Sequence, residues 1–220
     1  MTEQEMIAKT MEFVKAELHQ AEGGHDWFHI ERVWKNTKTI AKNEPCDLFV
    51  AELGALLHDI ADHKFHGGDD TIGVEKARSF LESLQAPGEV TDRVVKIMTG
   101  ISFKGGNVQQ ESFSPELAVV QDADRLDAIG AIGIARAFNY GGFKGREMYN
   151  PAIQPQTGMT PEQYQKSTAP TLNHFYEKLL LLKDRMNTKT GREMAEQRHR
   201  YMEQFLEQFY FEWNGGEPSP

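Results

Sequence analysis

The sequence predicts an all-α fold, and three observations support this class. Apolar residues recur every three or four positions along most of the chain, which is typical of helices that bury one face. No stretch of useful length alternates apolar and polar residues, and no internal repeat is present. The 220 residues, 39% of them hydrophobic, suffice for a sizeable core, so we expect one domain over 1–213 and a flexible Gly- and Pro-rich tail over 214–220.

Composition narrows the class of partners. The formal net charge of −9 argues against a nucleic-acid partner, which usually requires a basic stripe, and favours a small-molecule protein. The single cysteine, Cys46, cannot form an internal disulfide, and neither a signal peptide nor a membrane-spanning apolar run is present. We therefore expect a cytoplasmic protein without a membrane partner.

The first half of the chain predicts five helices. Thr2 and Glu5 form a capping box before the first helix, and Asp26 caps a second helix that runs to Ile40. Asp47 caps a third, which is apolar on nearly all sides up to Leu57 and should therefore be central and buried. Two amphipathic segments follow, over 71–84 and 91–101, with Pro87-Gly88 between them.

The second half predicts four further helices and one long loop. Ser114-Pro115 is a typical helix start, and the helix that follows ends near Asp127. A helix over 129–138 precedes a Gly-, Pro- and Gln-rich stretch over 140–160, long enough for an active-site lid or a binding loop. Two long amphipathic helices are expected over 170–186 and 190–213.

A His-Asp pair interrupts the apolar third helix. His58 and Asp59 directly follow an uninterrupted apolar face, where their polar atoms need compensation by a metal ion or by a hydrogen bond to each other. A lone His-Asp dipeptide would favour the hydrogen bond. His29 and Asp124 are similarly out of place among core residues, and the four together form a His2Asp2 set that suits an octahedral divalent metal. His19, His174 and His199 have polar helical surroundings, so we expect solvated or capping roles for them.

Three segments carry a family resemblance. His29 in HDWFHIERVW, His58 and Asp59 in LLHDIADH, and Asp124 in QDADRLDAIG resemble the H...HD...D signature of HD-domain metal-dependent phosphohydrolases. The SFKGG stretch and the segment MNTKTGREMAEQRHRYMEQFLEQF look like a bacterial subfamily that includes nucleoside-triphosphate pyrophosphohydrolases, so the resemblance covers nearly the whole chain. It implies an HD-domain helical bundle with a central metal site.

The resemblance also resolves two ambiguous ligands. His25 and His29 lie four residues apart, and the family's H-x-x-R-V form selects His29, which leaves His25 to line the pocket. The family's Ala-Asp-x-Leu pattern selects Asp124 over Asp122. Two-metal members use further histidines between the HD pair and the last aspartate, whereas this chain has none between His66 and His174, so we expect one ion. Mn²⁺ is favoured, with Ni²⁺, Co²⁺, Fe²⁺ and Mg²⁺ as alternatives.

The resemblance and the charges suggest how the remaining residues act. Asp62, one helical turn after His58, stands where mononuclear HD nucleotidases place a catalytic acid, and Asp127 is the reserve candidate for the proton acceptor. A phosphorylated substrate needs cationic side chains near the site. The competing interpretation of each candidate lysine or arginine is an ordinary solvated surface residue. The candidate substrate-binding cations are Arg32, Lys64, Lys104, Arg125 and Lys144.

The predicted function is a metal-dependent phosphohydrolase with a small phosphorylated substrate. We expect hydrolysis of nucleoside or deoxynucleoside triphosphates to monophosphates and pyrophosphate. The alternatives are a 5′-nucleotidase or other phosphomonoesterase with the same site, and a nucleotide-sensing module without catalysis. The sequence leaves open whether the chain is a monomer or a homodimer.

Overall fold

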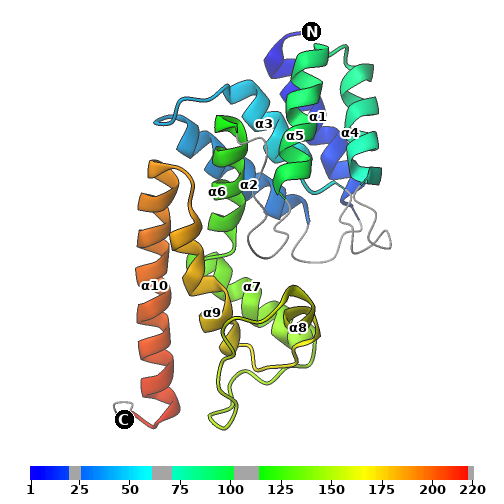
Figure 1. Ribbon diagram of the computed structural model, residues 1–220. Coiled ribbons are helices and arrows are strands. Elements are labelled where there is room, and N and C mark those ends of the chain that lie inside the picture. Colours follow the sequence, from blue (N-terminus) through cyan, green and yellow to red (C-terminus); the bar gives the residue numbers. More distant parts are fainter. Residues whose placement is uncertain (20–25, 61–70, 102–113, 218–220) are drawn as a thin grey trace. The chain divides into compact units, whose positions relative to one another are not determined.

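The computed structural model describes residues 1–19, 26–60, 71–101 and 114–217, and over these ranges it contains helices and no β-strand (Figure 1). The predicted all-α class is therefore confirmed. The chain divides into two compact units, a first unit of Met1–Asp124 and a second unit of Arg125–Pro220. No helix in the described ranges is both long enough and apolar enough to cross a bilayer.

The first unit contains helices that begin where the sequence indicates. The predicted caps are present: Thr2 and Glu5 form both bonds of the capping box, Asp26 accepts from the His29 N–H, and Asp47 accepts from the Val50 N–H. Its helices are α1 (Glu3–Glu17), α2 (Trp27–Ala41), α3 (Leu48–Leu57), α4 (Thr71–Ser83), α5 (Gly88–Ile101) and α6 (Pro115–Asp127), whose last three residues belong to the second unit.

Helix α3 is the central element of the first unit. It packs against α1, α2 and α5, which surround it in Figure 1. Leu53, Leu56 and Leu57 are completely buried, as the apolar sequence predicts. A Cβ atom on Gly54 would lie 2.7 Å from Cδ1 of Ile97, so the glycine allows the close approach of α3 and α5. This packing fixes the end of α3, where the His-Asp pair follows.

Helix α5 begins three residues before the predicted start at Thr91. The carbonyl oxygen of Pro87 accepts a hydrogen bond from the Thr91 N–H at 3.1 Å, so the first helical turn already includes Gly88. The Pro-Gly pair, which predicts a break, therefore lies at the helix start. Proline is tolerated there because its missing N–H has no helical partner in any case.

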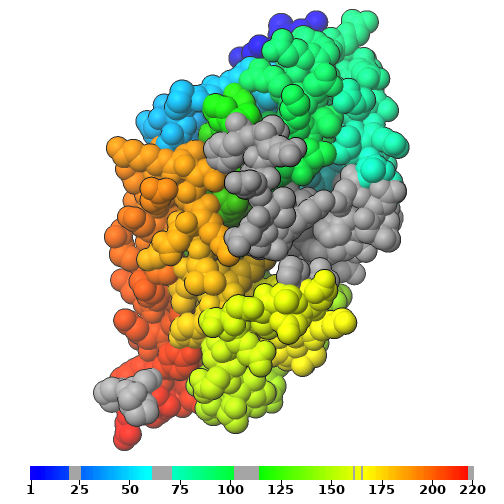
Figure 2. All heavy atoms as spheres, viewed as in Figure 1, coloured from blue at the N-terminus to red at the C-terminus, as the bar shows by residue number. Residues whose placement is uncertain are grey.

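The second unit has a core of helices and aromatic rings. Phe138, Phe175 and Phe205 meet with ring centroids 5.8 to 6.0 Å apart, and Phe175 is completely buried. Figure 2 shows its later helical segments, orange to red, along one side of this unit. Its elements are α7 (Gly130–Phe143), α8 (Pro161–Lys166), α9 (Asn173–Glu177), the 3-10 helix η1 (Leu179–Arg185) and α10 (Lys189–Trp213).

Helix α7 extends beyond its predicted end at Phe138 to Phe143, into the stretch expected to be a loop. A Cβ atom on Gly141 would lie only 2.0 Å from Oγ1 of Thr171. The glycine therefore serves close packing within a helix, whereas the sequence pattern suggested a turn. Tertiary contacts outweigh the low helix propensity of glycine at this position.

The helix predicted over 170–186 is wrong as a single α-helix. The backbone breaks at Lys178, with φ −145° and ψ −56°, between α9 and η1. In η1, Leu179 and Leu182 are both buried, and their spacing of three residues matches one turn of a 3-10 helix. Apolar spacings of three and four residues look alike in a sequence of this length, which explains the error.

Candidate metal centre

Helix α2 places His29 in the first unit's core. Its buried face contains Ile30, Val33 and Ile40, which have no exposed surface, and His29 belongs to the same face with 3% exposure. The Asp26 carboxylate accepts the His29 backbone N–H at 2.9 Å, which fixes the first turn. The imidazole is therefore held by a capped helix whose other buried side chains are apolar except for Thr37.

The end of α3 orients the second histidine. His58 is the C-terminal cap of α3, and its Nδ1 lies 2.8 Å from the carbonyl oxygen of Ala55. A carbonyl oxygen can only accept, so Nδ1 donates its proton and Nε2 keeps a lone pair. This is the tautomer that a metal-ligating histidine requires, with the backbone carbonyl fixing the ring. Asp59 follows directly and is half-buried.

Helix α6 brings Asp124 to the same place, and its earlier turns are tied to the rest of the first unit. Gln121 Nε2 donates to the Gly100 carbonyl at 2.8 Å, and Asn36 Nδ2 donates to the Ala123 carbonyl at 3.4 Å. A Cβ atom on Gly100 would meet Leu117 Cδ2 at 2.7 Å, so α5 and α6 approach closely. These contacts hold the turn that precedes Asp124.

An ion-pair cluster at the start of α6 completes this support. Arg93 binds Asp47 at 2.8 Å and Glu116 at 3.1 Å, and the Asp47 N–H donates to Glu116 Oε1 at 3.0 Å. Burial alone would raise the pKa of Glu116, but hydrogen bonds from the Asp47 and Glu116 N–H groups and from Ser114, together with the Arg93 charge, hold it below its ordinary value. The start of α3 is thereby joined to α5 and α6.

Three of the four predicted ligands meet in space, and Asp124 lies beside the two histidines. One donor atom each from His29, His58 and Asp59 lie within 4.8 Å of one another. Asp124 Oδ1 lies 3.6 Å from His29 Nε2 and 4.0 Å from His58 Nε2. The two imidazole rings meet edge to face, with centroids 5.4 Å apart. Side chains from α2, the end of α3 and α6 thus form one polar cluster at the edge of the apolar core, where the Asp124 side chain is 37% exposed.

These separations fit donor atoms around one cation better than hydrogen bonds. Both His–Asp distances exceed hydrogen-bond length, whereas ligands at about 2.1 Å from one ion lie roughly 3 to 4 Å from each other. The Ala55 carbonyl leaves the His58 Nε2 lone pair available, and the carboxylates supply negative charge. The donor set therefore fits a divalent metal ion of the class that accepts mixed nitrogen and oxygen ligands.

Comparison with known proteins agrees with this geometry. The HD domain model matches residues 27–129, which contain all four predicted ligands. The chain is 40% identical over 211 residues to the uncharacterized protein YpgQ of Bacillus subtilis strain 168, with 94% of each chain covered. The chain belongs to the HD-domain family of metal-dependent phosphohydrolases.

Solved HD-domain structures extend the likeness to the whole fold. The crystal structure of an HD-superfamily hydrolase from Bacillus thuringiensis is 46% identical, with a TM-score of 0.78, and covers 97% of this chain and 99% of its own. The crystal structure of B. subtilis YpgQ in complex with ADP is 39% identical, with a TM-score of 0.75 and 95% of each chain covered. The likeness therefore includes both units of the HD-domain chain.

The predicted substrate-binding cations have different surroundings. Arg32 is half-buried on α2, three residues after His29. Arg125, in the second unit, donates from Nη1 to the Arg185 carbonyl at 2.6 Å. Lys144, also in the second unit, is exposed just after α7. Lys64 and Lys104 lie outside the described residues.

The two candidates for the proton acceptor also differ. Asp62 lies outside the described residues, as does His25. Asp127 is 1% exposed, and its Oδ2 accepts a hydrogen bond from Arg136 within the second unit. Asp122 is completely buried on α6. The Asp127 carboxylate is therefore already engaged in an ion pair, which leaves Asp62 as the better candidate.

Sequence reasoning missed some supporting groups and misjudged two histidines. No sequence signal marks the Ala55 carbonyl, because any residue offers the same acceptor. The ion pairs of Arg93 with Asp47 and Glu116 join separate helices, so they could not be predicted before the helix packing was known. His199 is 8% exposed in the middle of α10, and His174 is half-buried and hydrogen-bonded to Tyr164, so the solvated or capping roles expected for them are wrong. Burial followed from the tertiary packing of the second unit.

Proposed function

We propose that this HD-domain protein hydrolyses nucleoside and deoxynucleoside triphosphates to monophosphates and pyrophosphate, with His29, His58, Asp59 and Asp124 as ligands of one divalent ion. The observation that carries the proposal is the convergence of these four side chains, with His58 held in the ligating tautomer by the Ala55 carbonyl. The ADP complex of YpgQ supports a nucleotide as the substrate class. The proposal places the reaction in the cytoplasm.

Mn²⁺ is the favoured ion, because two imidazoles and two carboxylates form a mixed set of intermediate hardness; Ni²⁺, Co²⁺, Fe²⁺ and Mg²⁺ remain alternatives. When bound, such an ion stabilises negative charge on a phosphoryl group and acidifies a water molecule. The protein's own contribution is to hold its four ligands on packed helices, so that little reorganisation accompanies the reaction.

Proton transfer and substrate binding fall to other side chains. We assign the proton acceptor to Asp62, because Asp127 is already paired with Arg136. Arg32, Lys64, Lys104 and Arg125 are the proposed phosphate contacts at the metal centre, whereas Lys144, first expected among them, is assigned to a separate site in the second unit. Arg125 donates one N–H to the Arg185 carbonyl, and its guanidinium geometry suits a phosphate group.

The reaction is tested by product analysis with the full-length protein. A panel of ribo- and deoxyribonucleotides is incubated with Mn²⁺, Mg²⁺, Co²⁺ or Ni²⁺, and the products are resolved by chromatography. We expect pyrophosphate and the monophosphate from triphosphates, with the highest rate in Mn²⁺. Orthophosphate released from monophosphates would replace the proposal with a phosphomonoesterase, and tight binding without turnover would replace it with a sensor.

A further inference from the structure

The C-terminal end of α7 exposes two aromatic rings. Tyr140 is 50% exposed and Phe143 is 65% exposed, although aromatic side chains usually bury most of their surface. The segment that follows them, yellow-green in Figure 2, lies at the surface of the second unit. Two large exposed rings at one helix end form a surface on which another flat group can bind.

Two cations accompany these rings. Lys144 Nζ lies 5.6 Å from the Tyr140 centroid and 5.1 Å from the Phe143 centroid, and the Arg146 guanidinium carbon lies 5.6 Å from the Tyr140 centroid. Tyr140, Phe143, Lys144 and Arg146 are called the α7 cluster below. Within the part of the chain that the structure describes, no carboxylate forms an ion pair with either cation. Their charge is therefore available to an anion.

The backbone under the cluster is fixed. Gly145 has a φ of +64°, a left-handed conformation that glycine adopts at little cost, and it allows the Arg146 N–H to bond the Gly141 carbonyl at 2.9 Å. The Thr171 N–H bonds the Glu147 carbonyl at 2.9 Å. The loop that presents Lys144 and Arg146 is thus held at both ends, which lowers the entropic cost of binding.

The Arg146 side chain is partly anchored. Its Nη2 donates to the Ser167 carbonyl at 2.7 Å, which holds the guanidinium beside Tyr140. A guanidinium has five N–H groups, so most remain for a ligand and can bind a phosphate in a forked geometry. This anchoring distinguishes Arg146 from a flexible surface arginine.

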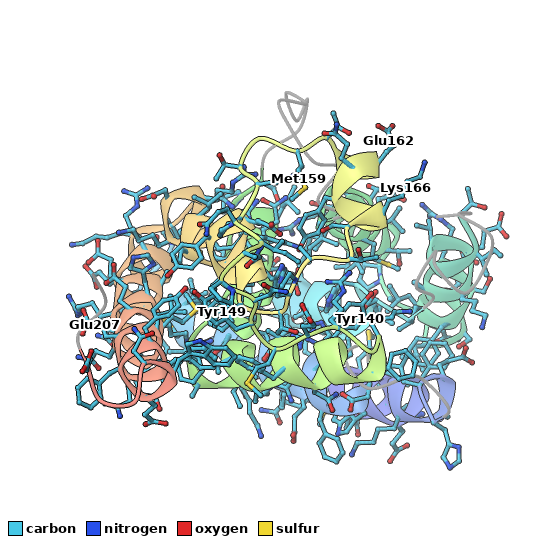
Figure 3. The ribbon with its side chains drawn as sticks, turned by 90° about the horizontal axis from the view of Figure 1, so that it is seen from below. Tyr140, Tyr149, Met159, Glu162, Lys166 and Glu207 are labelled. Atoms are coloured by element: carbon cyan, nitrogen blue, oxygen red, sulfur yellow. The ribbon has the colours of Figure 1, made fainter. Side chains whose placement is uncertain are left out.

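Charges of both signs lie near the α7 cluster, because Glu147 directly follows Arg146 and the Glu177 charge acts on Tyr164. Lys178 lies over the Tyr164 ring at 5.6 Å, and Tyr164 bonds His174. Burial, followed by the charges of Lys178 and Arg146, lowers the pKa of His174 to about 4, so this imidazole is neutral at pH 7. Figure 3 shows Glu162 on the outer side of α8, away from Tyr140, and its carboxylate accepts from Thr160. The two cations of the α7 cluster, Lys144 and Arg146, nevertheless form no ion pair with these carboxylates.

Two ordinary explanations account for only part of the cluster. Cations near a helix C-terminus interact favourably with its dipole, which explains a lysine there but not two exposed rings. A purely apolar partner would use the rings, but it would leave the cations desolvated without an anion. A ligand that combines a flat aromatic group with phosphates satisfies both.

We propose that the α7 cluster is a nucleotide-binding site, in which Arg146 and Lys144 bind the phosphates and the exposed rings of Tyr140 and Phe143 stack against the base. The site uses residues of the second unit alone and requires no metal ion. It does not rest on the proposed hydrolysis, and it binds nucleoside diphosphates as well as triphosphates, because its contacts do not depend on which phosphate is terminal.

The phosphate contacts are tested by calorimetric titration of the full-length protein with ADP and with pyrophosphate, both in Mn²⁺ and in a chelator. We expect binding to persist in the chelator and to weaken about tenfold or more in Lys144→Gln and Arg146→Gln, since each removes a charge-assisted contact. Lys189→Gln on α10, where the side chain is 86% exposed, is the matched control for lost charge and should not alter affinity.

The base contacts are tested with ADP and pyrophosphate side by side. Tyr140→Leu and Phe143→Leu should weaken ADP about threefold to tenfold and leave pyrophosphate unchanged, since only ADP has a base to stack. Arg146→Gln could loosen α8, because it removes the hydrogen bond to the Ser167 carbonyl. Lys144→Gln does not have this side effect, because the Lys144 ammonium forms no described hydrogen bond with the protein. Far-ultraviolet circular dichroism checks that every variant is folded.

The proposal is overturned if no ligand binds in the chelator, or if Lys144→Gln, Arg146→Gln and Lys189→Gln have the same ADP affinity as the parent protein. Asp59→Asn separates this outcome from failure of the proposed hydrolysis. It should abolish turnover and leave chelator-independent ADP binding intact. A parent protein without turnover that still binds ADP through Arg146 would refute the hydrolysis and support the site.

Discussion

The two units gather opposite kinds of chemistry. In the first unit, two imidazoles and two carboxylates converge from α2, the end of α3 and α6, so the cluster is complementary to a cation. In the second unit, Lys144 and Arg146 gather over exposed rings, which is complementary to an anion with an aromatic group. Burial therefore decides how easily a site can be recognised from the sequence. The first stands out against an apolar core, whereas the second resembles ordinary surface until side-chain distances are known.

Removal of a predicted metal ligand should have the largest effect. Asp59→Asn keeps the size of the side chain but removes its charge, so we expect divalent-metal binding to be lost and kcat/KM to fall by about a thousandfold. Metal content is measured by elemental analysis after dialysis, and turnover by pyrophosphate release. The variant should remain folded, because Asp59 is only half-buried.

A matched substitution on α5 serves as the control for the loss of one negative charge. Asp92 is exposed in the same unit and pairs with Arg78 at 3.0 Å. Asp92→Asn loses the same charge without touching the cluster, and exposed pairs contribute little, so metal content and turnover should stay at parent values. Retained turnover in metal-free Asp59→Asn would refute the assigned metal centre.

Truncation of the helix beneath the centre should have the next largest effect. Leu56 is completely buried on α3, and Leu56→Ala should lower the free energy of unfolding by about 2 to 5 kcal/mol because it leaves a cavity. Leu48 on the same helix is 44% exposed, so Leu48→Ala should have a much smaller effect. Urea denaturation of both variants compares them. Equal losses would show that α3 is not the central buried helix.

The fold was predictable wherever local chemistry decides it. Asp26 and Asp47 cap the helices they were expected to cap, and the apolar run from Leu53 to Leu57 is buried. The prediction failed at Gly141 and Lys178. Gly141 lies inside α7 because Thr171, thirty residues away in sequence, packs against it, and no local pattern reports such a contact. Long-range packing decided the error at Gly141, whereas the ambiguity between three- and four-residue apolar spacings decided the error at Lys178.

The candidate sites were predictable to different degrees. His58 and Asp59 are conspicuous because they follow an apolar run, and the family resemblance supplied His29 and Asp124. Tyr140 and Arg146 stand in a stretch that looks like a polar loop, so no contrast marked them as a pair. A residue that is unusual for its surroundings can be recognised from sequence, whereas a cluster assembled from unremarkable residues requires coordinates.

A substitution of Asp127 distinguishes a catalytic role of this carboxylate from a purely stabilising one. Its buried carboxylate binds Arg136, and its charge also opposes the fall that burial causes in the pKa of Arg198. Asp127→Asn should therefore lower the free energy of unfolding by about 2 to 3 kcal/mol and leave kcat of the folded fraction nearly unchanged. A fall in kcat of about a hundredfold with unchanged stability would instead identify Asp127 as the proton acceptor.

The smallest effect concerns acid stability of the second unit. His174 Nδ1 forms a hydrogen bond with the Tyr164 hydroxyl, and burial together with the charges of Lys178 and Arg146 lowers its pKa from 6.5 to about 4. Between these values the unfolded chain binds the proton that the folded chain excludes, so stability is complete above pH 6.5 and falls as the pH is lowered toward 4. At pH 5 this loss amounts to about 2 kcal/mol relative to pH 8. His174→Gln keeps a hydrogen-bonding group for the Tyr164 hydroxyl but cannot titrate, so its unfolding free energy should depend less on pH over this range. His19→Gln on the exposed surface should keep the parent's slope. Identical pH profiles for His174→Gln and the parent would mean that the His174 imidazole is neither buried nor held near Lys178 and Arg146 in solution as it is in the structure.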